Sequence, residues 1–313
     1  MPAVSIIIVS YNCKRLILQC IDSICRETTR TDFEIIVVDN ASVDGTPEAL
    51  SQVFPQVRLV RLPENVGFGR GCNAGAAQAA GNWILLLNPD AIVLPDAIDR
   101  LLRFAQDHPD AGIWGGHIVN PDGSIANGSC WRFPSLWSTF CTVAGLARAF
   151  PRSDFFNRES YGGWQHDSIR QVDVICGCLL LISRTLWGRL EGFDPVYFMY
   201  SEEVDLCLRA QALGARPLVS PDVGVVHYVG GTQAVPTDRL VLRFKGQITY
   251  MLRHWSPWRR QLGKLLLLCL PLSRYLSFRL LASLPGGRKA LPKAQAWRDV
   301  WHRRDVWLPG YPG

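Results

Sequence analysis

The sequence predicts an α/β fold, with a doubly wound, mostly parallel sheet followed by a C-terminal helical extension. Short apolar runs rich in β-branched residues alternate with helical patterns through the first two thirds of the chain, as in parallel strands joined by crossover helices. Apolar residues make up 48 % and charged residues 19 % of the 313 residues, which supports a sizeable core and excludes a disordered chain. From residue 235 onward the pattern changes to basic, aromatic helices.

The predicted elements follow one another in strand–helix order. The first run, residues 4–10, is β-branched and apolar on both faces, as in a strand buried within a parallel sheet. Further strands are expected at residues 33–39, 57–62, 83–88, 172–182, 216–220 and 223–227. Helices are expected at residues 13–24, 47–54, 69–80, 95–107 and 202–213. Residues 120–167 lack periodicity, and either a substrate-covering loop or an inert insertion fits them.

Charge is divided unevenly along the chain. Residues 1–238 carry 18 basic and 25 acidic side chains, whereas residues 239–313 carry 15 basic side chains against Asp299 and Asp305. This division predicts an anionic partner for the C-terminal part. The ten cysteines are scattered, the N-terminus lacks a basic leader, and the longest apolar run, residues 265–272, is shorter than a bilayer span. A cytoplasmic protein with reduced thiols is therefore expected.

Polar residues stand directly after three of the expected strands. They are Ser10, Tyr11 and Asn12 after the first strand, Asp39 and Asp44 after the second, and Asn88 and Asp90 after the fourth. Ligands of doubly wound sheets bind beyond the carboxyl ends of the strands, so these residues predict a binding crevice. Turn formation and helix capping use the same residue types and remain the alternative for any one of them.

Three more residues suggest what such a crevice binds. Asp90 follows a buried strand, where a carboxylate can hold a divalent cation that offsets the charge of a diphosphate. His227 ends the last strand and is either a ligand or a structural residue. Arg70 lies in a glycine-rich segment, residues 67–75, whose small side chains allow a helix to approach the sheet closely. Its guanidinium is a candidate partner for phosphate.

Three carboxylates, Glu202, Glu203 and Asp205, cluster at an expected loop-to-helix junction. Acidic side chains at a helix N-terminus interact favourably with the helix dipole. A carboxylate that faces the crevice can instead take a proton from an acceptor hydroxyl. Spacing alone leaves both interpretations open.

Five motifs stand in order between residues 4 and 231. They are VSIIIVSYN, IIVVDNASVDGT, ENVGFGRGCNAG, LLLNPD and FDPVYFMYSEEVDLCLRAQALG. Together they resemble the successive motifs of family 2 glycosyltransferases, and especially a bacterial rhamnosyltransferase-like branch. The resemblance implies the GT-A type of doubly wound fold and an inverting transferase that uses a nucleotide-diphospho-sugar donor. The residues after position 235 are not covered by it.

The resemblance also implies roles for individual residues. Ser10, Tyr11 and Asp39 match positions that contact the base and ribose of the donor, and Asn12, Asp44, Arg70 and Asn88 complete the predicted donor site. Asp90 matches the metal-binding carboxylate of the DXD motif, in which Asn88 replaces the first Asp, and His227 matches a late histidine of the metal or diphosphate shell. The implied cofactor is Mg²⁺ or Mn²⁺. Glu203 falls at the position of the catalytic base, where the family usually has Asp, and Asp205 is the second candidate.

The expected function is therefore the transfer of a hexosyl unit, with inversion, to a hydroxyl of a cell-surface glycan or a lipid-linked acceptor. Rhamnose or another deoxysugar, carried for example by dTDP, is the favoured donor sugar. The alternative is a nucleotidyltransferase, or a degenerate protein that binds sugar nucleotides without turnover. Pyrophosphate release from a nucleoside triphosphate separates the first of these from a glycosyltransferase.

Two parts are expected, a catalytic domain at residues 1–234 and a helical extension at residues 235–313. Basic and aromatic residues of the extension suit a helix at an anionic membrane surface, here the inner face of the plasma membrane. The alternative is a helical hairpin packed on the body or on a second subunit in a homodimer. Pro271, Pro285 and Pro292 are expected to break any single long helix. No motif supports nucleic-acid binding.

Overall fold

The structure is a computed structural model that describes residues 1–126, 128–228 and 236–312. The chain divides into two compact units. The first comprises residues 1–133, 164–198 and 202–228, and the second comprises residues 134–163 and 199–201 together with the described residues from Pro236 onward. The helices that were expected as a C-terminal extension thus share a unit with part of the 120–167 region.

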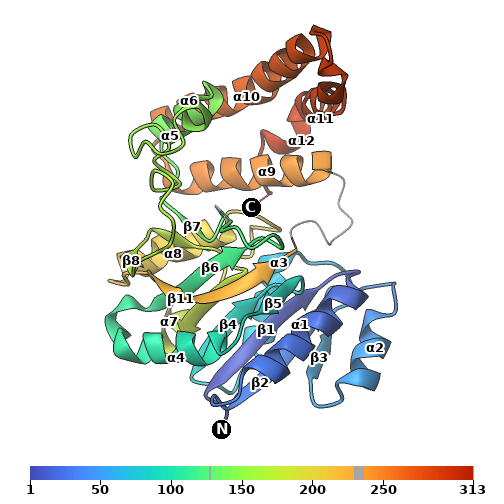
Figure 1. The fold of residues 1–313 in the computed structure, drawn as a ribbon, viewed down its shortest axis with the longest axis vertical. Coiled ribbons are helices and arrows are strands. Elements are labelled where there is room, and N and C mark those ends of the chain that lie inside the picture. Colours follow the sequence, from blue (N-terminus) through green and yellow to red (C-terminus); the bar gives the residue numbers. More distant parts are fainter. Residues whose placement is uncertain (127, 229–235, 313) are drawn as a thin grey trace. The chain divides into compact units, whose positions relative to one another are not determined.

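The first unit is built on a mixed, mostly parallel sheet (Figure 1). The strand order within the described residues is β3-β2-β1-β4-β10-β6-β11-β5, and β8 pairs with β11. These strands are β1 Val4–Ser10, β2 Phe33–Asp39, β3 Arg58–Arg61, β4 Trp83–Leu87, β5 Ala91–Val93, β6 Ile113–Val119, β8 Arg170–Gln171, β10 Leu179–Ser183 and β11 Leu218–His227. β1 to β4 are parallel, β10 runs antiparallel to both β4 and β6, and β11 pairs parallel with β6. A separate pair joins β7 Cys130–Trp131 to β9 Val174–Ile175.

Helices cover both faces of this sheet, as a doubly wound fold requires. They are α1 Lys14–Glu27, α2 Thr46–Val53, α3 Phe68–Ala76, α4 Ala97–Asp107, α7 Arg184–Arg189 and α8 Glu202–Ala212, with a 3₁₀ turn at Pro109–Ala111. Ile6 and Ile8 of β1 join a core cluster with residues of α1 and α4. Ile7, which points to the opposite face, contacts α3 at Gly75. β1 is buried along its whole length because apolar layers pack on both sides of it.

Most expected elements are present, and the differences have local causes. Expected strand 172–182 is interrupted between β9 and β10, while the two expected strands at 216–227 form the single strand β11 with a register shift between Val219 and Gly224. β6 was not expected because glycines interrupt its apolar run. A Cβ on Gly116 would lie 2.3 Å from the Val223 carbonyl oxygen, so a residue without a side chain is needed where these strands meet.

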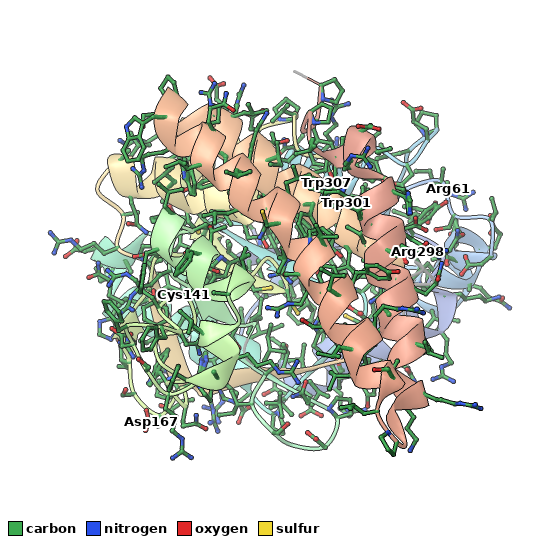
Figure 2. The ribbon with its side chains drawn as sticks, turned by 90° about the horizontal axis from the view of Figure 1, so that it is seen from above. Arg61, Cys141, Asp167, Arg298, Trp301 and Trp307 are labelled. Atoms are coloured by element: carbon green, nitrogen blue, oxygen red, sulfur yellow. The ribbon has the colours of Figure 1, made fainter. Side chains whose placement is uncertain are left out.

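The second unit is helical. It contains α5 Leu136–Val143, α6 Leu146–Ala149, α9 Pro236–His254, α10 Pro257–Ser283, α11 Leu291–His302 and α12 Arg304–Trp307, with a 3₁₀ turn at Gly287–Ala290. α10 packs against α11 and α5, which lie next to it in Figure 2. Buried Trp307 donates from Nε1 to the Val300 carbonyl oxygen at 2.9 Å and packs 4.8 Å from the Phe244 ring. Residues 120–167, for which a substrate-covering loop or an inert insertion was expected, thus contain two helices, α5 and α6.

Pro271 does not break the long helix, contrary to expectation. α10 runs without interruption from Pro257 to Ser283. A proline removes one backbone donor, and here Leu267, Leu270 and Pro271 are all buried, so packing offsets the lost hydrogen bond. Pro285 does follow the end of α10, and Pro292 lies in the first turn of α11. Among the described helices, α10 alone is long and apolar enough to cross a membrane by length and composition, with a mean hydropathy of 1.5 over its most apolar 18 residues.

A cavity of about 270 Å³ lies within the helical unit. Its walls include Phe244, Met251 and Leu267, and two guanidinium groups, those of Arg243 and Arg274, also line it. None of the site residues expected from the sequence lines this cavity.

Candidate active site

The first wall of the candidate site is formed by the ends of β1 and β2. Asp39, the last residue of β2, is 2 % exposed, and its Oδ2 accepts a hydrogen bond from the Ser42 backbone N–H at 3.0 Å. Its Oδ1 is buried and has no hydrogen-bond partner among the described residues. A buried carboxylate oxygen in this state is an acceptor for a ligand N–H or O–H. Asp39 therefore fits the donor-binding role that the sequence predicts.

Asn12 and Asp44 connect the loops that follow these two strands. Asn12 has a positive φ of 48°, and its Oδ1 accepts from the Val43 N–H at 2.8 Å. Asp44 accepts from the backbone N–H groups of Lys14 at 3.0 Å and Thr46 at 3.1 Å. Burial raises the pKa of Asp44, but hydrogen bonds from Thr46 and Lys14 outweigh burial and hold the pKa below its usual range. Both side chains thus shape the loops.

Ser10 and Tyr11 differ in their access to solvent. Ser10 is fully buried, and its Oγ lies 3.3 Å from the Cys13 Sγ. Tyr11 is 45 % exposed, so its ring is free to stack on a ligand. The Ser10 carbonyl oxygen also accepts from the Asn40 N–H at 2.8 Å, which joins the ends of the first two strands.

The structure brings Asn88, Asp90 and His227 together. β5 pairs with β11 so that Ala91 lies opposite His227, and this register places Asp90 beside the imidazole. The His227 Nε2 lies 2.9 Å from Asp90 Oδ1 and 3.3 Å from Asn88 Nδ2. Asp90 is only 7 % exposed. Three residues from the ends of β4 and β11 thus converge, although only His227 and Asp90 are within ion-pairing distance.

The donor set of this cluster suits a hard divalent cation in part. A carboxylate oxygen and an imidazole nitrogen both bind Mn²⁺, and Mg²⁺ accepts the carboxylate. No group of three His, Cys, Asp or Glu side chains suitable for a metal occurs within the described residues. A cation held by Asp90 and His227 would therefore need its remaining ligands from water and from the phosphates of a substrate, as is usual for Mg²⁺ in nucleotide sites.

Two glycines let α3 lie directly on the sheet, and a third lets the chain pass close to a neighbouring loop at the start of the helix. A Cβ on Gly71 would lie 2.8 Å from Val9 Cγ1, and one on Gly75 would lie 2.6 Å from Ile7 Cγ2. At the start of the helix, Gly67 has a φ of 88°, and its missing Cβ would lie 2.0 Å from the Phe198 carbonyl oxygen. The expectation that small residues allow close approach of this helix is confirmed.

The same helix holds the loop that leads to α8. Arg70 Nε donates to the Pro195 carbonyl oxygen at 2.8 Å, and the Phe68 N–H donates to the Phe198 carbonyl oxygen at 2.8 Å. Asn73 binds both backbone groups of Phe193, with its Nδ2 donating at 2.8 Å and its Oδ1 accepting at 2.9 Å. The sequence analysis missed Asn73, although a polar amide within a helix of glycines and alanines was the available signal.

Three carboxylates at the start of α8 lie in different surroundings. Asp205 is 1 % exposed and pairs with Arg209, whose Nε donates to Asp205 Oδ2 at 2.7 Å. Arg209 also donates to the carbonyl oxygens of Leu190 and Gly192 at 2.7 and 2.9 Å. Burial, and then the charge of Glu203, raises the pKa of Glu202 well above its usual value, so Glu202 favours its neutral form. Glu203 is less buried than either neighbour.

The turn between β9 and β10 links this acidic cluster to the Asp90 cluster. Burial raises the pKa of the Cys176 thiol to about 12, and the charge of Glu203 adds to the effect. Burial, then Cys176, then Asp90 raise the pKa of Cys178. The Asn88 N–H donates to the Cys178 carbonyl oxygen at 3.2 Å. The negative charges of Glu203 and Asp90 therefore raise the pKa values of two thiols in the same short turn, Cys176 and Cys178 respectively.

Comparison with solved structures identifies the class of fold. A mannosyltransferase from Pyrobaculum calidifontis, solved with GDP-Man and Mn²⁺, matches with a TM-score of 0.56 and 20 % identity over 98 % of this chain and 83 % of its own. GalNAc-T7, solved with UDP, GalNAc and Mn²⁺, matches with a TM-score of 0.56 and 16 % identity over 77 % of this chain and 48 % of its own. The protein has the GT-A fold of glycosyltransferases.

Sequence comparison then gives the family. The model of Glycosyl transferase family 2 matches residues 5–167. An N-acetylglucosaminyl-diphospho-decaprenol L-rhamnosyltransferase of Mycobacterium tuberculosis is 32 % identical over 247 residues, which cover 74 % of this chain and 78 % of the relative. The chondroitin synthase of Pasteurella multocida is 33 % identical over 188 residues, 56 % of this chain but only 19 % of that protein. The chain belongs to glycosyl transferase family 2, and it is similar to a rhamnosyltransferase within it.

Proposed function

We propose that this protein transfers a sugar, with inversion at the anomeric carbon, from a nucleotide-diphospho-sugar to a hydroxyl of a cell-surface glycan or a lipid-linked acceptor. The observation that carries the proposal is the convergence of Asp90 and His227 near the turn between β9 and β10, because β9 also packs against α8, the helix that begins with Glu202 and Glu203. Displacement at an anomeric carbon needs positive charge near the leaving diphosphate and a base near the attacking hydroxyl. These two groups of side chains suit those two needs.

The donor is proposed to bind across the ends of β1 and β2. Asp39 Oδ1 accepts from the base or ribose, and the exposed ring of Tyr11 lines the same wall. Ser10, whose side chain is fully buried, supports this wall through the contact of its carbonyl oxygen with the Asn40 N–H. Asn12 and Asp44 support this wall through their contacts with neighbouring backbone, rather than by direct contact with the donor. Arg70 and Asn88 complete the set, Arg70 by holding the Pro195 loop and Asn88 by its contact with His227.

Asp90 and His227 are proposed to hold Mn²⁺ or Mg²⁺. When bound there, the ion supplies positive charge that stabilises the departing diphosphate. Asp90 would contribute a carboxylate oxygen and His227 an imidazole nitrogen, and their 2.9 Å contact shows that the two side chains lie close enough to share one ion.

Glu203 is proposed as the base. Its carboxylate takes the proton of the acceptor hydroxyl while that oxygen bonds to the anomeric carbon, and the bond from this carbon to the diphosphate breaks on the opposite face. The ion pair between Asp205 and Arg209 favours Glu203 over Asp205, because a carboxylate held by a guanidinium is a weaker base. Glu202 favours its neutral form at the neighbouring position, which keeps a second negative charge away from Glu203.

Rhamnose or another deoxysugar is the proposed donor sugar. The rhamnosyltransferase from Mycobacterium tuberculosis supports this choice, because it covers most of both chains. The name of that relative also supports a lipid-linked diphosphate as the acceptor class. We further propose that the protein works at the cytoplasmic face of the plasma membrane, where its basic C-terminal residues meet anionic lipid.

A donor panel tests the proposal. The purified protein is mixed with Mn²⁺ and each of several nucleotide sugars, and thermal shift and release of nucleoside diphosphate are measured. We expect one donor, dTDP-rhamnose first, to raise Tm and to be hydrolysed slowly. Pyrophosphate release from nucleoside triphosphates would identify a nucleotidyltransferase instead, and binding of a donor without any turnover would identify a degenerate binding protein.

A further inference from the structure

One face of α10 carries a continuous row of exposed apolar side chains. Its members are Trp258, Leu262, Leu265, Cys269, Leu272, Leu276 and Leu280, spaced three or four residues apart. The Trp and Leu side chains of this row are between 38 % and 69 % exposed. At about 100° per residue all seven lie within roughly 80° of the helix circumference. We call this row the leucine stripe.

The opposite face of α10 is the one that packs inside the unit. Gly263, Leu267, Leu270 and Pro271 are buried there, and the helix contacts α11 and α5. The spacing places these residues about half a turn from the leucine stripe. The stripe is therefore not required for the core of the helical unit. Large exposed apolar patches of this kind mark interaction surfaces in proteins.

The charges around the stripe favour an anionic partner. No Asp or Glu occurs between Arg239 and Arg298, whereas thirteen Lys and Arg occur over that interval. Arg259 and Arg279 are exposed and lie to either side of the stripe, and Lys264 is half-buried nearby. An apolar face bordered by cations is the surface that a helix in the plane of an anionic bilayer presents.

The same charges argue against two other interpretations of the stripe, a contact between two copies of the chain and a helix that spans the bilayer. A second copy of α10 packed on the stripe would bring the Arg259 and Arg279 side chains of both copies into one interface, and α10 has no carboxylate to neutralise them. A helix that spans the bilayer would have to leave α5 and α11. It would also lose the hydrogen bond from Arg274 Nη2 to the Thr142 carbonyl oxygen, at 2.6 Å, and carry this guanidinium into lipid.

We propose that the leucine stripe is the membrane-contact surface of this protein, and that α10 lies in the plane of an anionic leaflet with the stripe inserted. The proposal rests on the proposed function only in that the membrane would hold the acceptor. Leu265 and Leu276, each 57 % exposed, lie at the middle of the stripe on two different turns. Their side chains are therefore expected to enter the lipid.

The first test compares two matched double variants of the full chain in sedimentation with vesicles. Vesicles of phosphatidylcholine alone and with phosphatidylglycerol are used. L265E/L276E should lower binding to the anionic vesicles by about tenfold or more, because two inserted apolar side chains become charged. V53E/L213E carries the same change in net charge at two exposed positions outside α10 and should bind nearly as the wild type does. Equal binding of the two double variants would overturn the proposal.

The second test uses the two cysteines that are exposed on helices, Cys269 within the stripe and Cys25 on α1. An environment-sensitive fluorophore is attached to Cys269 in the C25S protein and to Cys25 in the C269S protein. Anionic vesicles should shift the emission of the Cys269 label to the blue and leave the Cys25 label unchanged. Quenching of the Cys269 label by groups near the headgroups, more than by groups at the bilayer midplane, is expected for a helix in the plane. Strong midplane quenching would indicate a spanning helix and contradict the proposal.

Two controls separate this proposal from its rivals. Analytical ultracentrifugation without lipid should give the same mass for the wild type and L265E/L276E. A dimer that dissociates only in the variant, with vesicle binding unchanged, would make the stripe a contact between subunits. Hydrolysis of a water-soluble donor should be equal in both proteins, because it needs no membrane-held acceptor. A loss of vesicle binding with unchanged hydrolysis therefore separates the membrane proposal from the proposed donor chemistry.

Discussion

The carboxylates at the start of α8 show how surroundings can give neighbouring acidic residues different roles. Asp205 is ion-paired with Arg209, and Glu202 is buried with a raised pKa. Glu203 is less deeply buried than the other two carboxylates and is not part of the Asp205–Arg209 ion pair. A base that must release and regain a proton needs this intermediate environment.

Replacing Glu203 with Gln should abolish transfer and leave donor binding nearly intact. The amide keeps the size of the side chain but cannot accept the proton, and loss of a general base costs about 10²–10⁴-fold in rate. Initial rates and donor affinity by titration calorimetry would be compared with the wild type. If E203Q retains full turnover while D205N, still folded by circular dichroism, loses it, the base is Asp205.

The buried Glu202 makes stability depend on pH in a defined direction. The folded protein keeps the Glu202 proton at pH values where the unfolded chain has released it, so unfolding releases a proton and stability falls as pH rises above the usual Glu pKa of about 4.3. E202Q removes the ionisable group and with it this fall in stability. The Tm of E202Q relative to the wild type should therefore be higher at about pH 8 than at about pH 5. A difference in Tm that stays constant between these pH values would contradict the assignment.

Asp90 and His227 should together control the response to Mn²⁺. D90N removes the carboxylate and H227A the imidazole, so each should weaken the Mn²⁺-dependent rise in Tm with donor by about tenfold or more in metal concentration. H117A offers a matched control, because His117 is a partly buried histidine of β6 outside the cluster. An unchanged Mn²⁺ response in both D90N and H227A would exclude this cluster as the metal site.

Among the secondary-structure elements, α3 fits closely on the sheet because Gly75 has no Cβ. A Cβ on Gly75 would lie 2.6 Å from Ile7 Cγ2 and 3.0 Å from Val38 Cγ2. Gly75→Ala should therefore lower the free energy of unfolding by about 1–3 kcal/mol. Gly188→Ala is the control, because nothing lies within 4 Å of its added Cβ and alanine favours the helix by about 0.5–1 kcal/mol. Denaturant titrations that give both variants equal stability would show that α3 can shift without cost.

The elements that the sequence predicts well are those whose stability is local or uniform. β1 and β2 were expected with their observed bounds, because each contains an unbroken run of buried apolar residues. β6 was missed because Gly115 and Gly116 serve contacts with distant strands. The course of α10 through Pro271 was likewise decided by tertiary packing, which local propensity does not contain.

For the candidate site, sequence position and motif order proposed the residues, but could not predict how they pair. Asp90 and His227 are 137 positions apart and were both expected in the metal shell, and their 2.9 Å contact depends on the pairing of β5 with β11, where β5 itself was unexpected. Arg70 was a candidate partner for phosphate, and the structure adds that its Nε donates to the Pro195 carbonyl oxygen. Spacing in the sequence cannot reveal such a backbone partner, because the partner carries no side-chain signature.

At the scale of the whole molecule, the division of charge separates two kinds of chemistry. The carboxylates of the candidate site belong to the acidic residues 1–238, and the leucine stripe lies among the basic residues 239–313. Screening should therefore affect the two functions differently: added salt should weaken binding to anionic vesicles strongly and hydrolysis of a soluble donor only slightly. Vesicle binding and donor hydrolysis would each be measured at several ionic strengths. Equal salt dependence of the two would contradict the separation of membrane binding from donor chemistry.

The central claim is inverting sugar transfer with Glu203 as the base. The most direct test is to follow the reaction of the active nucleotide sugar with its acceptor by proton NMR, in the wild type and in E203Q. The first product of the wild type should have the anomeric configuration opposite to that of the donor, and E203Q should form no product while still binding the donor. A product with retained configuration, or equal product formation by E203Q, would contradict it.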